Sequence, residues 1–278
     1  MRHATWLRIE ASSFWYGLYR RYRILPGGLR APMRALAMPR WQLAAWLIRA
    51  RSRGRVFAGP FRGMKLLLSP VSRRHHLGYL LGSQERELHE AIERIVATGY
   101  GTVVNVGAAD GYYAVGLALR SPGTRVIAFE ALAEMHPVIA RVAALNRVGD
   151  RVAIFGACGI ADLRRAVAAA GPKTLVVMDI EGGEAKLLDP RLAPELRQAD
   201  ILVETHDAFV PGVTDLLIER FVETHAVECH AAQPRAIGDF PDGFLSVIKR
   251  RLPRLAVDLM NERRAGQQCW LFLRATGR

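Results

Sequence analysis

Ionisable side chains follow several apolar runs of this sequence, where they could bind a ligand or move a proton. Asp179 ends the run TLVVMD, with Glu181 and Glu184 close behind it, and His206 follows the run ILVET. Because imidazole titrates near pH ~6.5, His206 could take a proton from a hydroxyl group at neutral pH. Asp179 and Glu181 could orient that hydroxyl or bind a divalent ion such as Mg²⁺. Glu184 could equally be a helix cap, and His206 a hydrogen-bonded loop residue.

The run VVNVGAADGYYAVGLA combines a strand, a turn of small residues and the start of a helix. Gly107, Ala109 and Gly111 would let the backbone turn sharply and approach a ligand closely. The helix that follows would direct its free N–H groups and the positive end of its dipole at that ligand. A dinucleotide-binding turn needs glycine where Ala109 and Tyr112 stand, so the pattern disfavours a nicotinamide dehydrogenase.

A second acidic position follows this turn in the run RVIAFEA. Glu130 stands nineteen residues after Gly111, at the tip of the next apolar run. A carboxylate in that place can accept both hydroxyls of a ribose, because two O–H donors meet its two oxygens. A plain surface glutamate at a strand end is the alternative interpretation.

Seven apolar runs alternate with helical stretches after Gly101, which predicts an α/β fold with a mostly parallel sheet. Continuous Val, Ile and Leu indicate that helices cover both faces of that sheet. The expected strands are 102–107, 125–130, 151–156, 174–179, 199–205, 225–230 and 269–275, with helices near 112–119, 134–146 and 160–170. Ligands of such sheets lie at the carboxyl ends of the strands, where the acidic residues and His206 fall.

The charge is uneven along the 278 residues, whose net value is +13. Residues 1–65 hold 14 Arg and Lys against one acidic residue, whereas residues 66–278 hold 25 of each sign. Apolar residues from Leu7 to Leu25 recur at helical spacing, opposite several arginines. We therefore expect a basic N-terminal extension over 1–65, which consists of an amphipathic helix and a linker. A catalytic domain is expected over 66–278. The helix could contact an anionic membrane or pack on its own domain, and an Arg-rich start is also typical of a transit peptide.

Cysteine usage and hydropathy limit the class of protein further. Cys158, Cys229 and Cys269 lack metal-ligand spacing and are odd in number, which argues against zinc and against a disulfide framework. A reducing, cytoplasmic compartment fits that pattern, with peripheral contact at the inner membrane surface left open. The longest interior apolar run, Trp41 to Ile48, is too short to span a bilayer. The balanced charge of 66–278 and the lack of a stacking or finger motif argue against nucleic acid as a partner, and the oligomeric state stays open.

Taken together, several motifs resemble those of FkbM-type methyltransferases over roughly residues 80 to 275; they are NVGAADGYYAVGLA, AFEA, MDIEGGE, ETHD and NERRAGQQCWLFL. The resemblance implies a Rossmann-like, seven-stranded class I methyltransferase sheet whose last strand is antiparallel. It also implies S-adenosylmethionine as cofactor, with Asp179 facing the transferred methyl group. The cofactor-binding residues expected on this basis are Asn105, Gly107, Ala109, Asp110, Gly111, Tyr112, Glu130 and Asp179. Asn105 stands where the family usually has an acid.

The leading hypothesis is methyl transfer to a hydroxyl group on a glycan or another secondary-metabolite-like small molecule. His206 would be the base, and Asp179, with Glu181, would orient the acceptor or a Mg²⁺ ion. The alternative is a non-catalytic nucleotide-binding module that its basic arm recruits to an anionic surface, for which Asn105 is the hint.

Overall fold

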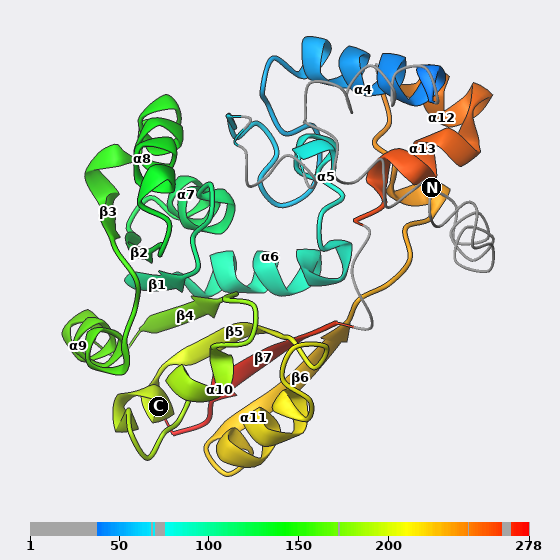
Figure 1. Ribbon diagram of the computed structural model, residues 1–278. Helices are drawn as coiled ribbons and strands as arrows, with labels where there is room; N and C mark the ends of the chain where they lie inside the picture. The colour runs from blue at the N-terminus through cyan, green and yellow to red at the C-terminus, as the bar shows by residue number, and fades with distance from the viewer. Residues whose placement is uncertain are drawn as a thin grey trace, which may run out of the picture.

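A seven-stranded mixed β-sheet forms the centre of the protein, as seen in a computed structural model (Figure 1). The structure describes residues 38–67, 69, 76–171, 173–243, 245–262 and 268–277. The strands are β1 (Thr102–Val106), β2 (Arg125–Phe129), β3 (Val152–Phe155), β4 (Thr174–Met178), β5 (Asp200–Thr205), β6 (His225–Ala231) and β7 (Cys269–Ala275). All seven expected strands are therefore confirmed, within one residue at their ends.

The strand order is β3-β2-β1-β4-β5-β7-β6. Strands β1 to β5 pair in parallel, whereas β7 is antiparallel to both β5 and β6. This topology confirms the predicted Rossmann-like α/β sheet with an antiparallel last strand. The chain runs outward from β1 to β3 and returns to β4 beside β1, so the strand order reverses there. Ligands of open α/β sheets bind at such a reversal, outside the carboxyl ends of the strands.

Helices cover both faces of the sheet, because successive residues of a strand point to opposite faces. Val103 of β1 packs with α6 (His89–Thr98), α7 (Tyr112–Arg120) and α8 (His136–Leu145). Its neighbour Val104 packs on the other face with α9 (Ile160–Ala170), α10 (Glu184–Leu187) and α11 (Val213–Phe221). Every residue of β4 and β5 is buried, as expected for strands with covered faces.

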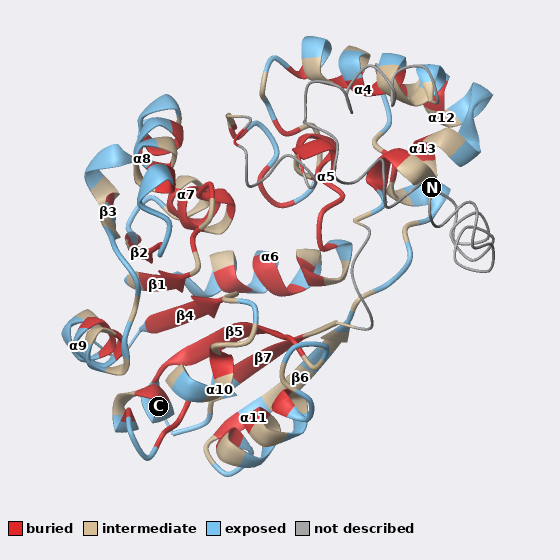
Figure 2. Cartoon of the chain, viewed as in Figure 1, coloured by how far each residue is buried: buried red, intermediate tan, exposed pale blue. Residues whose placement is uncertain are grey.

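Four further helices form a separate apolar cluster above the sheet, which we call the helical cap (Figure 1). They are α4 (Pro39–Ser52), α5 (His76–Leu81), α12 (Ser246–Arg251) and α13 (Pro253–Met260). Ala45 and Ile48 of α4 are fully buried in this cluster together with Leu80 and Ala256. Figure 2 shows the inner side of α4 buried and its outer side exposed. The cap thus joins the segment before the sheet to the segment between β6 and β7.

The segment that follows α4 packs against the helices of the sheet. Phe61 is fully buried, and a Cβ atom on Gly116 of α7 would lie 2.7 Å from its ring. The Lys65 N–H donates to the side chain of Asn146 at 2.8 Å, and the Asn146 amide donates back to the Lys65 carbonyl at 2.8 Å. The described part of the predicted N-terminal extension is therefore built into the fold. The amphipathic helix expected between Leu7 and Leu25 lies outside the described residues.

Two cysteines are joined across the last two strands. The expectation of no disulfide was wrong for this pair, because the structure links Cys229 of β6 to Cys269 of β7. The antiparallel pairing of β6 with β7 brings their Cα atoms to 6.5 Å although 40 residues separate them in the chain. Cys158 is a free thiol, and burial, followed by the nearby Asp162 carboxylate, raises its pKa to about 12. Among the described helices, none has the length and hydropathy needed to cross a membrane.

A buried ion group connects the cap to the sheet. Arg235, in the loop after β6, donates to Glu87 at 2.7 Å and to Glu262 at 2.8 Å. Glu87 lies in the turn before α6 and Glu262 follows α13, and the exposed fractions of the three side chains are 3 to 6%. The Glu262 carboxylate also accepts the Glu85 N–H at 2.8 Å. This group joins three segments that are distant in the sequence.

Removing the guanidinium should leave two buried carboxylates without their cation. We expect Arg235→Met to lower the free energy of unfolding by about 3 to 5 kcal/mol, measured by chemical denaturation. The control is Arg164→Met, which breaks an exposed pair with Glu195 and should lower the free energy of unfolding far less, because water screens exposed ion pairs. Equal losses in the two variants would show that the buried group does not hold these segments together.

Candidate functional site

The turn after β1 passes very close to the end of β4. A Cβ atom on Gly107, whose φ is 82°, would lie 1.8 Å from the carbonyl oxygen of Asp179. Glycine is therefore required here, because any other residue would push the two strand ends apart. Ala109 also has a positive φ of 48°, and Gly111, at 87°, caps the start of α7. The predicted small-residue turn thus exists, and it adjoins the predicted acidic loop.

Glu130 connects the turns that follow β1 and β2. One carboxylate oxygen accepts the Ala109 N–H at 2.7 Å and the other accepts the Leu132 N–H at 2.8 Å. The residue is 7% exposed, and its carbonyl oxygen lies 2.7 Å from Nε2 of His136. Each carboxylate oxygen has about two acceptor positions, so both oxygens can accept one more donor. The side chain is thereby held ready for a ligand that carries two adjacent hydroxyls.

The remaining residues predicted around this turn lie in different settings. Asn105 is buried in β1 and donates to the carbonyl of Val177 at 3.3 Å, while its Oδ1 finds no donor among the described residues. Asp110 is 2% exposed within the turn. The ring of Tyr112 instead stacks on Tyr79 of α5, with centroids 4.2 Å apart, so it joins α7 to the cap. Tyr112 is also the first residue of α7, directly after the turn.

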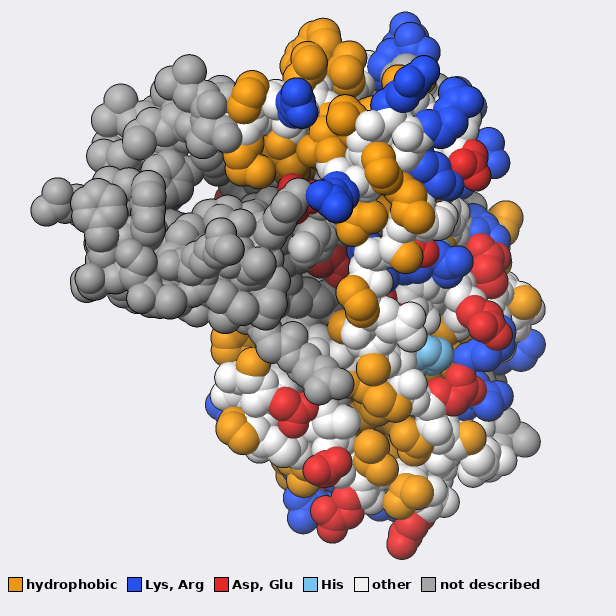
Figure 3. All heavy atoms as spheres, turned by 90° about the vertical axis from the view of Figure 1, so that its right-hand side faces the viewer, with side chains coloured by type: hydrophobic (Ala, Val, Ile, Leu, Met, Phe, Trp, Pro, Cys, Tyr) orange, Lys and Arg blue, Asp and Glu red, His pale blue; other side chains and the backbone are white. Residues whose placement is uncertain are grey.

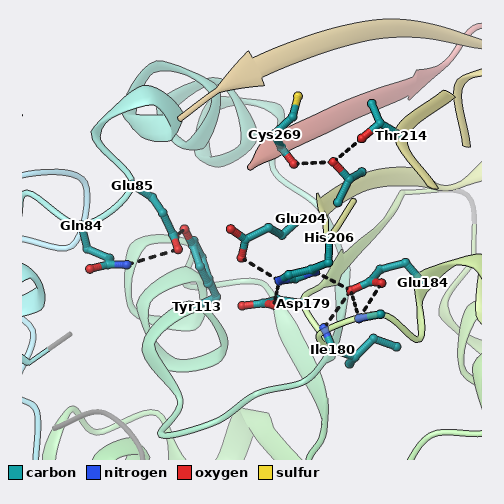
Figure 4. Close-up of polar contacts among 12 residues, drawn as sticks. Gln84, Glu85, Tyr113, Asp179, Ile180, Glu184, Glu204, His206, Thr214 and Cys269 are labelled. Carbon is teal, nitrogen blue, oxygen red and sulfur yellow. Dashed lines mark hydrogen bonds and ion pairs between the residues drawn. The ribbon is translucent and has the colours of Figure 1, made fainter. Parts of the chain in front are cut away.

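A second polar group lies at the ends of β4 and β5 (Figure 4). The Nδ1 atom of His206 is 2.9 Å from Oε1 of Glu184. Its Nε2 atom lies 3.6 Å from Oδ1 of Asp179 and 3.8 Å from Oε2 of Glu204. His206 and Glu204 are almost completely buried, whereas the Asp179 side chain keeps 38% exposure. The imidazole thus presents Nδ1 to a fully buried carboxylate and Nε2 to Asp179, whose side chain is partly exposed.

Glu184 orients the imidazole and is itself held by backbone N–H groups. It is fully buried and accepts from the N–H groups of Gly182 at 2.9 Å and Ile180 at 3.3 Å. Burial alone would raise its pKa, but the hydrogen bonds from His206 and the backbone outweigh it and lower the pKa. An ionised Glu184 requires a proton on Nδ1 of His206. Its sequence position at a helix start also suits a helix cap, but its contact with Nδ1 makes Glu184 the partner of His206.

The electrostatic surroundings favour a proton on the imidazole. Burial alone lowers the pKa of His206, but the hydrogen bond to Glu184 and the charges of Asp179 and Glu184 outweigh it and raise the pKa. Burial raises the pKa of Asp179, and the charge of Glu184 adds to this, although His206 acts in the opposite direction. The Nε2 atom of His206 therefore lies where a proton can be accepted and then shared with Asp179.

Two neighbouring acids do not join this group. Glu181 is exposed, because a positive φ of 51° at this residue, followed by 109° at Gly182, turns the loop so that Glu184 reaches His206 instead. Asp207 accepts the Gly212 N–H at 3.0 Å and a hydrogen bond from Thr214 at the start of α11. Within the described residues Glu181 makes no hydrogen bond to His206, but its charge adds to the raised pKa of both His206 and Asp179.

Three residues that sequence reasoning did not single out lie on the cap side of the site. Tyr113 of α7 donates to Glu85, and Figure 4 shows this pair across from Glu184. Burial raises the pKa of Tyr79, and the carboxylates of Asp110, Glu85 and Asp179 add to the increase. Tyr79 therefore lies within electrostatic reach of both polar groups. Tyr113 lies within the motif NVGAADGYYAVGLA, but no motif marks Tyr79 or Glu85, whose place depends on how the cap packs over the sheet.

The second group also has the composition of a metal site, but its geometry favours proton transfer. Ligand atoms of Asp179, Glu184 and His206 lie within 4.8 Å of one another. However, Glu184 faces Nδ1 and Asp179 faces Nε2, and one ion cannot contact both ring nitrogens. Mg²⁺ usually binds through one or two carboxylates and several waters, but the Glu184 carboxylate already accepts from His206 and from backbone N–H groups. These contacts lend no support to the Mg²⁺ considered from the sequence.

The pKa of His206 can be measured without knowledge of any substrate. By NMR titration of the histidine rings we expect a value above 6.5 in the wild-type protein. The substitution Glu184→Gln removes a negative charge beside Nδ1, so it should lower the His206 pKa. The control Glu223→Gln changes the same charge at an exposed position after α11 and should leave the pKa in place. An unchanged pKa in Glu184→Gln would refute the role given to this carboxylate.

Comparison with known proteins gives likenesses among solved structures. No protein-family model matches the chain, and no curated protein matches it. An O-methyltransferase from Bacillus cereus in complex with SAH is 12% identical, with a TM-score of 0.43; the match covers 84% of this chain and 90% of that one. The O-methyltransferase TomG from Streptomyces achromogenes, in complex with SAM, is 13% identical, with a TM-score of 0.46 and coverage of 76% and 92%. Both are likenesses of fold.

Proposed function

We propose that this chain is an S-adenosylmethionine-dependent methyltransferase that acts on a hydroxyl group. The observation that carries the proposal is the contact between Gly107 and the backbone of Asp179. It places the turn that Glu130 braces directly beside the loop that leads to Glu184 and His206. A ligand held by the first group would therefore present its far end to the second.

The residues around the turn fit this cofactor. Glu130 has one acceptor position left on each oxygen for the two ribose hydroxyls. Gly107, Ala109 and Gly111 form the turn that would cradle the methionine part, with the start of α7 behind it. Asn105 and Asp110 are buried polar groups at the same turn. When bound, S-adenosylmethionine supplies an electrophilic methyl group on a positively charged sulfur.

The chemistry of the chain itself is proton removal from the acceptor. The Nε2 atom of His206 accepts the proton of the acceptor hydroxyl while Nδ1–H remains hydrogen-bonded to Glu184. The charges of Asp179 and Glu184 stabilise the imidazolium ion that forms. The acceptor oxygen, freed of its proton, would then bond to the methyl carbon while the bond from that carbon to sulfur breaks, with S-adenosylhomocysteine as the leaving group. Asp179, with its partly exposed side chain, is placed to orient that oxygen.

The resemblance in the sequence suggests a hydroxyl of a glycan or another secondary-metabolite-like small molecule as acceptor. Tyr79, Tyr113 and Glu85 line the cap side of the site, and aromatic and carboxylate groups together suit a polyhydroxylated ring. The alternative of a non-catalytic nucleotide-binding module leaves the buried Glu184 and His206 pair without a role. For that reason we favour the enzyme.

Cofactor binding can be tested by calorimetry with S-adenosylmethionine and S-adenosylhomocysteine. We expect Glu130→Ala to weaken binding by roughly tenfold or more, since the loss of a charged hydrogen bond costs about 1.5 to 3 kcal/mol. Glu134→Ala, at an exposed position in the same loop, serves as control and should bind normally. If folded Glu130→Ala keeps the wild-type affinity, the ribose does not bind at this carboxylate.

Turnover can be followed as release of S-adenosylhomocysteine with a panel of glycan and polyketide alcohols. His206→Ala should reduce turnover by roughly 10²-fold or more while cofactor affinity stays normal, as expected for loss of a general base.

In the wild-type enzyme, turnover should rise as the pH passes through the raised pKa of His206, because only the neutral ring accepts a proton. Asp179→Asn should also impair turnover, and EDTA should not. Full activity of His206→Ala, or loss in EDTA that Mg²⁺ restores, would contradict this mechanism.

A further inference from the structure

The outer side of the helical cap exposes large apolar side chains. Leu43 and Trp46 of α4 are 59% and 61% exposed, and Val247 and Leu252 of the α12 segment are 60% and 39% exposed. Leu43 and Trp46 are one helical turn apart and therefore share a face, opposite the buried residue Ile48. Exposed tryptophan and leucine on one helix face are costly in water and usually mark an interaction surface.

The same helices carry a strong excess of positive charge. Residues 39–55 contain five arginines and no acidic residue. Residues 246–260 contain Lys249, Arg250, Arg251 and Arg254 against a single acid, Asp258. Figure 3 shows orange apolar and blue basic side chains gathered at the top of the molecule, at the level of the cap. Two segments about 200 residues apart thus contribute the same two kinds of side chain.

We propose that the helical cap docks on an anionic lipid bilayer. The apolar side chains Leu43, Trp46, Val247 and Leu252 would enter the interface, where tryptophan is favoured because its ring is amphipathic. The basic residues of α4 and α12 would lie near the lipid phosphates, to which they are complementary in charge. Nucleic acid fits less well, since it offers no apolar layer for the four apolar side chains. The surface includes residues 246–254, far from the N-terminal segment to which the charge count alone pointed.

The full chain should be tested with vesicles of phosphatidylglycerol mixed with phosphatidylcholine, and with vesicles of phosphatidylcholine alone. We expect binding to the acidic vesicles at low salt and release at high salt, because salt screens the attraction. The double variant Arg250→Glu with Arg251→Glu should weaken vesicle binding by at least about tenfold. Leu43→Ser with Trp46→Ser should weaken it as well. Quenching of tryptophan fluorescence by brominated lipid should decrease in Trp46→Phe.

The matched control is Arg141→Glu with Arg197→Glu, which makes the same charge change at exposed positions on α8 and before β5. It should bind acidic vesicles as the wild-type protein does, because residues 1–37 and the cap are unaltered in it. Circular dichroism would verify that every variant is folded. Binding that both cap variants retain, or that the control loses equally, would overturn the proposal. Self-association that the cap variants abolish, without vesicle binding, would assign this face to a second copy of the chain instead.

Discussion

The close approach of Gly107 to the backbone of Asp179 is the constraint on which the site depends. The parallel pairing of β1 with β4 aligns the ends of these strands, and the glycine lets the two following turns pass in contact. The side chains of the two polar groups are positioned relative to that contact. Glu130 braces the turn on one side, and the loop with a positive φ at Gly182 wraps around Glu184 on the other.

Two kinds of contact stabilise the buried carboxylates described here. One kind joins segments of the fold, and the other occurs in the candidate site. Glu87 and Glu262 share one guanidinium in the interior, which offsets part of their negative charge and holds the segments together. Glu130 and Glu184 are stabilised by backbone N–H groups, which provide no full positive charge. The Glu184 carboxylate is thereby free to face the imidazole of His206, and each oxygen of Glu130 has room for one more donor. The loops that contain Ala109 and Gly182 therefore supply the N–H groups that stabilise these two carboxylates.

The sheet could be predicted from the sequence because strands covered on both faces are continuous apolar runs, as in β4 and β5. Glu130 and His206 could be found because strand ends mark the ligand edge of such a sheet. The helical cap could not be predicted, since Ile48 and Ala256 belong to segments that meet only through tertiary packing. The partner of His206 was also ambiguous, because only the turn of the loop decides between Glu181 and Glu184.

The central claim is that the turn braced by Glu130 receives the cofactor beside His206. The most direct measurement is an amide NMR titration of the full chain with S-adenosylhomocysteine. We expect the resonances of Ala109 and Leu132, whose N–H groups donate to Glu130, to shift strongly and to follow the same binding curve as that of Asp179. Resonances of Arg250 and Arg251 on the cap should stay in place. If the ligand leaves Ala109 and Leu132 unchanged, or shifts only residues away from the ends of β1, β2 and β4, the assignment of this site is wrong.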